Sequence, residues 1–274
     1  TWIKKSKKRS DIVLATKIAG PGDYTKHIRT TGFSENSLNE AVENSLKRLQ
    51  TDYIDLYQLH WPDRNTNKFG VRGFKHEKNE SWEDNFKNIL HSLDKLIKSG
   101  KIRQVGLSNE NPWGVMRFLE ESKNNLPRMI TIQNPYSLLN RQFEVGNAEV
   151  SMRENIGLLA YSPLGCGVLS GKYIQKKDEE NSRLNLFKRF VRYSSKQSTE
   201  ATIRYLEIAQ RNNLSLTQMA LAFINQQPFV TSNIIGATNL EQLKENIDSV
   251  QIELKSETLK EIEKVHELIP DPAT

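Results

Sequence analysis

The residues of this chain that could take part in chemistry stand at the ends of short apolar runs. Lys17, His60 and the pair Ser108-Asn109 each follow directly on such a run, and Gln133 lies in or at the end of a fourth. If these runs are parallel strands of one sheet, their carboxyl ends meet at one edge, where α/β proteins bind their ligands. Taken singly, Lys17 is better interpreted as a solvated strand end and His60 as a hydrogen-bonded core histidine. Four polar strand ends on one rim nevertheless favour a small-molecule site.

The chain lacks the residues that several other kinds of catalysis and binding require. The five histidines include no pair at metal-ligand spacing and the single cysteine cannot build a thiolate site, so we expect no metal. No G-x-S-x-G elbow occurs for a serine nucleophile. Residues 165–171 nearly match G-x-G-x-x-G, but the third glycine comes one residue late, which argues against the dinucleotide motif of an open sheet. This glycine-rich turn with Lys172 predicts either a phosphate cradle or a simple surface turn.

Composition restricts the class of protein. The chain has 274 residues, 26% of them charged, and no apolar run approaches the length that spans a bilayer, which predicts no membrane partner. One cysteine suits a reducing compartment, so we expect a cytoplasmic protein. A net charge of +6 and the basic residues 4–9 are compatible with an acidic partner, yet no nucleic-acid motif accompanies them. A solvated helix end is the better interpretation, and we expect no nucleic-acid partner.

Strand-like and helix-like segments alternate along the whole chain. Strands are expected at residues 12–18, 53–61, 102–108, 129–137 and 156–163, with a last one ending at 234–236. Helices are expected after Ser34 up to residue 49, at 86–97, from Pro112, and at 143–155, 199–211, 216–226, 240–250 and 256–269. Residues 63–81 and 173–197 are expected to be long loops. Six strands, each with its helix, predict a parallel sheet, either open or belonging to a barrel that needs eight.

Longer motifs carry a resemblance to a known family. The chain resembles the aldo-keto reductases through Ala15-Thr16-Lys17, residues 52–62, Gly106-Leu107-Ser108-Asn109, residues 132–137, Tyr161-Ser162-Pro163-Leu164 and Gly171-Lys172-Tyr173. These motifs follow in order across essentially the whole chain. Residues 137–141, the loop around Gly70 and residues 236–243 are most similar to the bacterial Tas-type reductases, which are related to the potassium-channel β subunits.

The resemblance implies a (β/α)8 TIM barrel that binds NADPH and reduces aldehydes or ketones. Lys17 matches the lysine that lowers the pKa of an active-site tyrosine, and His60 matches the histidine that polarises the substrate carbonyl. The positions that match cofactor-binding residues of the family are Ser108, Asn109 and Gln133 for the carboxamide, Tyr161 for the nicotinamide ring, Ser162, Leu164, Gly167 and Lys172 for the pyrophosphate, and Thr238, Gln242, Glu245 and Asn246 for the adenosine end. Arg183 and Arg189 are candidates for the cation beside the ribose 2′-phosphate.

Two members of the family's catalytic tetrad have no counterpart in the chain. The aspartate and tyrosine belong at the end of the second barrel strand, and Tyr24, Tyr53 and Tyr57 are not in the matching context. We therefore expect a single barrel domain over residues 1–274 that is incomplete at its N-terminus by two βα units. We expect a longer parent protein to be active and residues 1–274 alone to be inactive.

The expected function is NADPH-dependent reduction of a small-molecule carbonyl to an alcohol by hydride transfer. The alternative is a non-catalytic NADP(H)-binding redox sensor or regulatory subunit. The sequence leaves open which aldehyde or ketone is the substrate and in which oligomeric state the protein works, because the loops after the strands determine specificity in folds of this kind.

Overall fold

The chain is described by a computed structural model over residues 2–23, 25–175, 182–187 and 192–274. It divides into two compact units. The first comprises residues 1–68, 73–133 and 154–156, and the second comprises residues 69–72, 134–153 and 157–274. The prediction of a single domain stays a prediction. No helix among the described residues is both long enough and apolar enough to cross a membrane.

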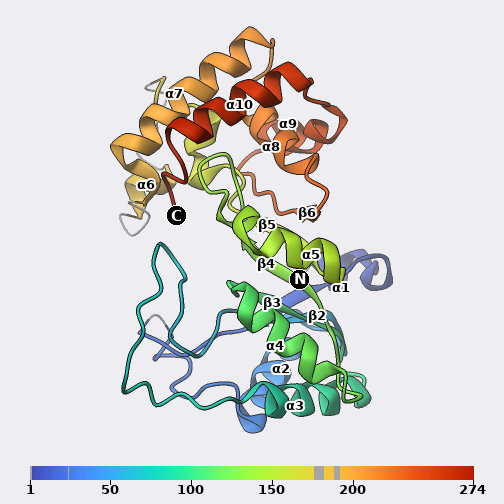
Figure 1. The fold of residues 1–274 in the computed structure, drawn as a ribbon. Helices are drawn as coiled ribbons and strands as arrows, with labels where there is room; N and C mark the ends of the chain where they lie inside the picture. The colour runs from blue at the N-terminus through green and yellow to red at the C-terminus, as the bar shows by residue number, and fades with distance from the viewer. Residues whose placement is uncertain (1, 24, 176–181, 188–191) are drawn as a thin grey trace. The chain divides into compact units, whose positions relative to one another are not determined.

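The first unit alternates strands and helices. Its elements are α1 (Trp2–Ser6), η1 (Arg9–Asp11), β1 (Ala15–Ile18), α2 (Glu35–Leu49), β2 (Ile54–Leu59), α3 (Phe86–Lys98), β3 (Ile102–Ser108), α4 (Pro112–Ser122) and β4 (Met129–Pro135), whose last two residues belong to the second unit. The strands pair in parallel in chain order, with Lys17 opposite Gln58, Leu59 opposite Leu107 and Ser108 opposite Gln133. Helices α2, α3 and α4 pack side by side in the same order (Figure 1).

Burial explains why these segments form. All six residues of β2 are buried, as expected for a strand covered on both faces of a parallel sheet. The apolar stripe of α3, including Ile89, Leu90 and Leu93, is buried as well. Ser34 caps α2 as expected, because its side chain accepts a hydrogen bond from the Ser37 N–H.

The second unit contains the remaining elements. They are η2 (Gln142–Val145), α5 (Asn147–Glu154), whose last residue belongs to the first unit, β5 (Gly157–Tyr161), η3 (Gly165–Ser170), α6 (Arg183–Leu186), α7 (Lys196–Arg211), α8 (Leu216–Asn225), β6 (Val230–Asn233), α9 (Leu240–Asp248), η5 (Ser249–Gln251) and α10 (Ser256–Leu268). Strands β5 and β6 pair in parallel, α7 packs on α10, and α8 packs on α9 and β6. Parallel strands alternating with helices form an α/β fold, consistent with the predicted barrel.

Some expected boundaries were wrong. The first strand begins at Ala15 instead of Ile12. The reason is that Arg9 donates a hydrogen bond to the Ile12 carbonyl and the Leu14 N–H donates one to the Asp55 carboxylate, so these backbone groups are already bonded to side chains. The helix expected at 143–155 is split at Gly146, whose backbone is not helical.

Two further boundaries in the second unit differ from the expected ones. The last strand ends at Asn233, where its pairing with β5 ends, before the residues 234–236 that were expected to finish it. The second long loop contains the short helix α6.

Candidate functional site

Lys17 lies in β1, one residue before its end, and is half-buried. Its ammonium Nζ donates to the Gln133 Oε1 at 2.8 Å, which joins β1 to β4 across 116 residues of sequence. Burial lowers the pKa of Lys17 below its ordinary value. The lysine is therefore a partly desolvated cation that can still influence a neighbouring acid.

His60 follows β2 directly, as the sequence predicted, and its side chain is half-buried. Its imidazole ring lies 4.6 Å, centroid to centroid, from the indole of Trp61. Burial, followed by the positive charge of Lys17, lowers the pKa of His60 from 6.5 to about 4. The imidazole is consequently neutral near pH 7, and one of its ring nitrogens carries a proton that can be donated as a hydrogen bond.

Ser108 and Asn109 are buried at the end of β3. Asn109 has a left-handed backbone, with φ of 54°, and its side-chain Nδ2 donates to the His60 carbonyl at 2.9 Å and to the Ser108 Oγ at 3.1 Å. Its own N–H donates to the Gln133 carbonyl at 3.0 Å. The first unit thus brings together all five of its predicted site residues: Lys17, His60, Ser108, Asn109 and Gln133.

Sequence reasoning missed Gln58 and Trp61. The fully buried Gln58 side chain donates to the Leu107 carbonyl at 3.2 Å and accepts from Gln133 at 3.4 Å, so it supports the amide that contacts Lys17. Trp61 packs against Gly20, where a Cβ would overlap the indole, and its Nε1 donates to the Pro21 carbonyl at 2.9 Å. A glutamine inside an apolar strand was the signal available for Gln58.

Among the described tyrosines of the first unit, Tyr57 does not take the place of an acid in this cluster. Tyr57 precedes Gln58 in a strand, so it points to the opposite face, and burial raises its pKa. Tyr24 lies outside the described residues.

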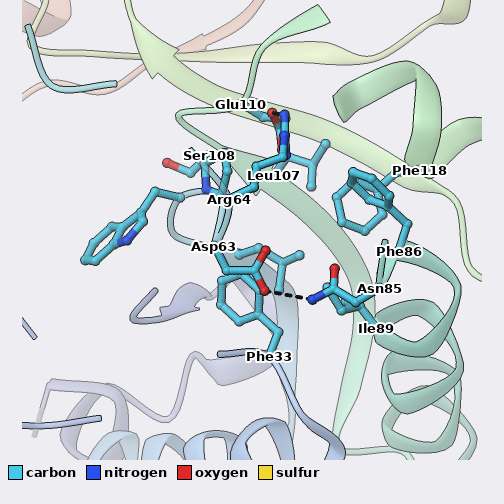
Figure 2. A pocket seen from close by; sticks show the side chains of 13 residues that line it. Phe33, Asp63, Arg64, Asn85, Phe86, Ile89, Leu107, Ser108, Glu110 and Phe118 are labelled. Carbon is cyan, nitrogen blue, oxygen red and sulfur yellow. Dashed lines mark hydrogen bonds and ion pairs between the residues drawn. The ribbon is translucent and has the colours of Figure 1, made fainter. Parts of the chain in front are cut away.

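A cavity beneath the end of β3 is too small to hold a substrate. It is lined by Ser108, Glu110, Arg64, Phe86 and others, as Figure 2 shows, and encloses about 10 Å³, room for about one water molecule. Asp63 at its edge accepts from Asn85 at 2.8 Å. We regard it as a packing gap beneath the candidate site.

The glycine-rich turn lies in the second unit, directly after β5. Tyr161 ends that strand, and burial raises the pKa of its phenol. Ser162 has a left-handed backbone, the Leu164 carbonyl accepts from the Gly167 N–H at 2.9 Å, and Gly167 has a φ of 93°. A Cβ at Gly167 would lie 3.2 Å from the Lys172 Cε, so the absence of a side chain lets the lysine lie against the turn.

The predicted adenosine-end residues lie just before α9 and along it. The Gln242 Oε1 accepts from the Thr238 N–H at 2.9 Å, and Glu245 accepts from the Ser215 hydroxyl at 2.5 Å. The buried Asn246 donates to the Gly236 carbonyl at 3.1 Å. Arg183 is exposed at the start of α6, and Arg189 lies outside the described residues.

Comparison with known proteins places this sequence in a family. The sequence matches the model of the aldo/keto reductase family over residues 1–267. The chain belongs to this family. It is 48% identical to Protein tas of Escherichia coli (strain K12), over 99% of this chain and 79% of that protein. It is 38% identical to an aldo-keto reductase of Babesia bovis, over 87% of this chain and 89% of that protein.

A third relative has a named activity. The L-glyceraldehyde 3-phosphate reductase of Escherichia coli (strain K12) is 30% identical, over 88% of this chain and 66% of that protein. Membership of the aldo/keto reductase family confirms the resemblance drawn from the motifs and identifies the chain as one of an oxidoreductase family. The residue roles within the site stay predictions.

Proposed function

We propose that the full-length protein transfers a hydride from NADPH to the carbonyl carbon of an aldehyde or ketone, giving an alcohol. The observation that carries this proposal is the cluster of Lys17, Gln133 and a neutral His60 at neighbouring strand ends. When bound, NADPH supplies the hydride. The carbonyl oxygen must also gain a proton, and the proposed donor is the tyrosine of the family's catalytic tetrad, whose matching context Tyr24, Tyr53 and Tyr57 lack.

His60 is proposed to orient the carbonyl. A neutral imidazole N–H can donate to the carbonyl oxygen and stabilise the negative charge that develops there. Lys17 is proposed to favour the deprotonated form of the acid that gives the oxygen its proton, because a nearby cation stabilises an anion. The lowered pKa of His60 supports the first role, since a protonated imidazole would be repelled by Lys17.

The donor and acceptor groups of the chain fit NADPH. A carboxamide needs both donors and acceptors, and Ser108, Asn109 and Gln133 carry hydroxyl and amide groups side by side. A pyrophosphate needs backbone N–H groups and a cation, which the turn around Gly167 and Lys172 offers. We therefore propose that these residues bind the cofactor.

Steady-state oxidation of NADPH, followed by absorbance with a panel of aldehydes that includes glyceraldehyde 3-phosphate, tests the proposal. Lys17→Met and His60→Ala in the full-length protein should each reduce kcat by about 100-fold or more, a typical loss for general acid–base groups. NADPH binding, measured by quenching of tryptophan fluorescence, should stay within a few-fold of wild type.

Lys47→Met and His91→Ala are matched controls, because both residues are exposed on helices. Unchanged turnover in Lys17→Met and His60→Ala would contradict their roles. Tight NADPH binding with a single slow turnover would favour the redox-sensor alternative, and a wild-type protein that binds no NADPH would contradict the proposed function altogether.

A further inference from the structure

A buried ion pair lies beside the candidate site. The guanidinium of Arg64 meets the carboxylate of Glu110 with both pairs of atoms, Nη1 to Oε2 at 3.0 Å and Nη2 to Oε1 at 2.5 Å. The side chains are only 6% and 3% exposed. Figure 2 shows the two side chains meeting at the rim of the small cavity beneath β3.

The surroundings of this pair are closed. The Arg64 guanidinium carbon lies 4.9 Å from the ring centre of Trp113 and 5.6 Å from that of Phe86. A Cβ at Gly114 would overlap both the Glu110 carboxylate and the Arg64 guanidinium. Arg64 is therefore engaged with an internal carboxylate, and it is not exposed to receive an anionic substrate.

Arg64 and Glu110 belong to the two segments that leave the site. Arg64 comes four residues after His60, and Glu110 comes directly after Asn109. The same two segments are also joined by the bond from Asn109 to the His60 carbonyl, and Asn111 donates to the Thr66 Oγ1 at 2.7 Å and to the Asn67 carbonyl at 3.0 Å. The ion pair is thus the buried, charged centre of a series of contacts that joins these two segments.

A gain in folding stability alone does not explain why the protein has a buried ion pair here. Removing two charges from water is costly, and apolar residues of similar volume often serve a protein core as well or better. What the pair provides is geometry, because a bidentate arginine–carboxylate contact restricts both distance and orientation.

We propose that Arg64 and Glu110 are positioning residues that hold residues 61–68 against the carboxyl end of β3 and thereby set the place of His60 relative to Asn109. The consequence for turnover rests on the proposed function, whereas the consequence for the surroundings of His60 does not. Neither residue is proposed to touch substrate or cofactor.

A double-mutant cycle separates the effect of the ion pair on the placement of His60 from its effect on folding stability. Arg64→Met and Glu110→Leu each leave a buried charge without its ion-pair partner and should lower the Tm, although the Asn111 N–H still donates to Glu110 in Arg64→Met. The double variant Arg64→Met/Glu110→Leu has no such charge, so most of the Tm should return. If the pair positions His60, kcat of the double variant should nevertheless stay about 10- to 100-fold below wild type, with the KM for NADPH changed less than threefold.

The titration of His60 provides a readout that does not need activity. Nuclear magnetic resonance of the imidazole should give a pKa near 4 in the wild type, with His60→Gln identifying the signal. Lys17 is the charged group that contributes to this value, and burial contributes most. Release of residues 61–68 in the double variant should expose the imidazole and move its pKa toward 6.5.

Gly114→Ala should displace Arg64 and Glu110 while both side chains keep their charges. Its added methyl overlaps the pair, so the His60 pKa should rise, whereas Gly73→Ala, with nothing within 4 Å of the new Cβ, should leave it unchanged. A His60 pKa that stays at its wild-type value in the folded double variant overturns the proposal, whatever turnover does. A shifted pKa in a protein that never turns over supports the positioning role and contradicts only the proposed function.

Discussion

His60 combines two properties that are separate in most histidines, a position at a strand end and a pKa well below neutrality. Burial disfavours its charged form, and the ammonium of Lys17 adds to the effect. Lys17 in turn stays near Gln133 through a hydrogen bond of 2.8 Å. At the residue scale the candidate site is therefore a partly desolvated cation beside a neutral hydrogen-bond donor, which suits the polarisation of a carbonyl.

This pKa predicts how stability depends on pH. His60 has a pKa of about 4 in the folded protein and about 6.5 in the unfolded chain, so between these values the unfolded chain binds a proton that the folded protein does not. Stability should fall as the pH is lowered from 6.5 toward 4, by about 1–2 kcal/mol after allowance for solvent screening. Urea unfolding across this range measures the effect.

His60→Gln is the control for this prediction, because it removes the titrating group. The variant should lose that part of the pH dependence, while His91→Ala, at an exposed position, should keep it. Equal pH profiles for wild type and His60→Gln would contradict the lowered pKa.

At the scale of elements, the ends of β1 and β2 are joined by close packing of Trp61 on Gly20. The indole also donates to the Pro21 carbonyl at 2.9 Å and lies beside the His60 ring. The parallel pairing of β1 with β2 places Lys17 opposite Gln58, so the same junction holds both strand ends of the candidate site.

Gly20→Ala should disturb this junction. The new methyl would overlap the Trp61 indole, and overpacking of this kind costs about 1–3 kcal/mol of unfolding free energy. We expect a lower Tm together with a changed tryptophan fluorescence. Gly73→Ala, where the new methyl meets nothing within 4 Å, should change neither, and a Gly20→Ala protein of wild-type Tm would show that Trp61 has room to move.

At the scale of the whole molecule, the predicted cofactor residues are distributed over both units. Ser108, Asn109 and Gln133 belong to the first unit, and the turn with Lys172 and the residues before and along α9 belong to the second. A ligand that binds only the folded chain raises the midpoint of unfolding.

NADPH at 100 times its Kd should therefore raise the Tm by about 5 °C, which follows from about 2.7 kcal/mol of binding linkage. Lys172→Met should reduce this shift by half or more, because it removes the cation beside the glycine-rich turn, while Lys260→Met on the exposed side of α10 should not. Differential scanning fluorimetry measures the shift, and equal shifts in Lys172→Met and wild type would contradict the pyrophosphate role.

The sequence by itself determined the alternation of strands and helices and the family. Local sequence patterns are enough for these two conclusions, because the apolar run of β2, the Ser34 cap and the polar residues at strand ends can all be read from the amino-acid sequence. It did not determine where β1 begins, because the Leu14 N–H donates to the carboxylate of Asp55, which lies 41 residues away in the sequence.

Only the tertiary structure decided which groups face one another. The contact of Lys17 with Gln133 joins residues 116 apart in the chain, and the pairing of Arg64 with Glu110 joins residues 46 apart. The pKa of His60 depends on burial by such distant neighbours, which no local pattern encodes. The sequence therefore named candidate residues for a site, and packing decided their electrostatics and the ion pair beside them.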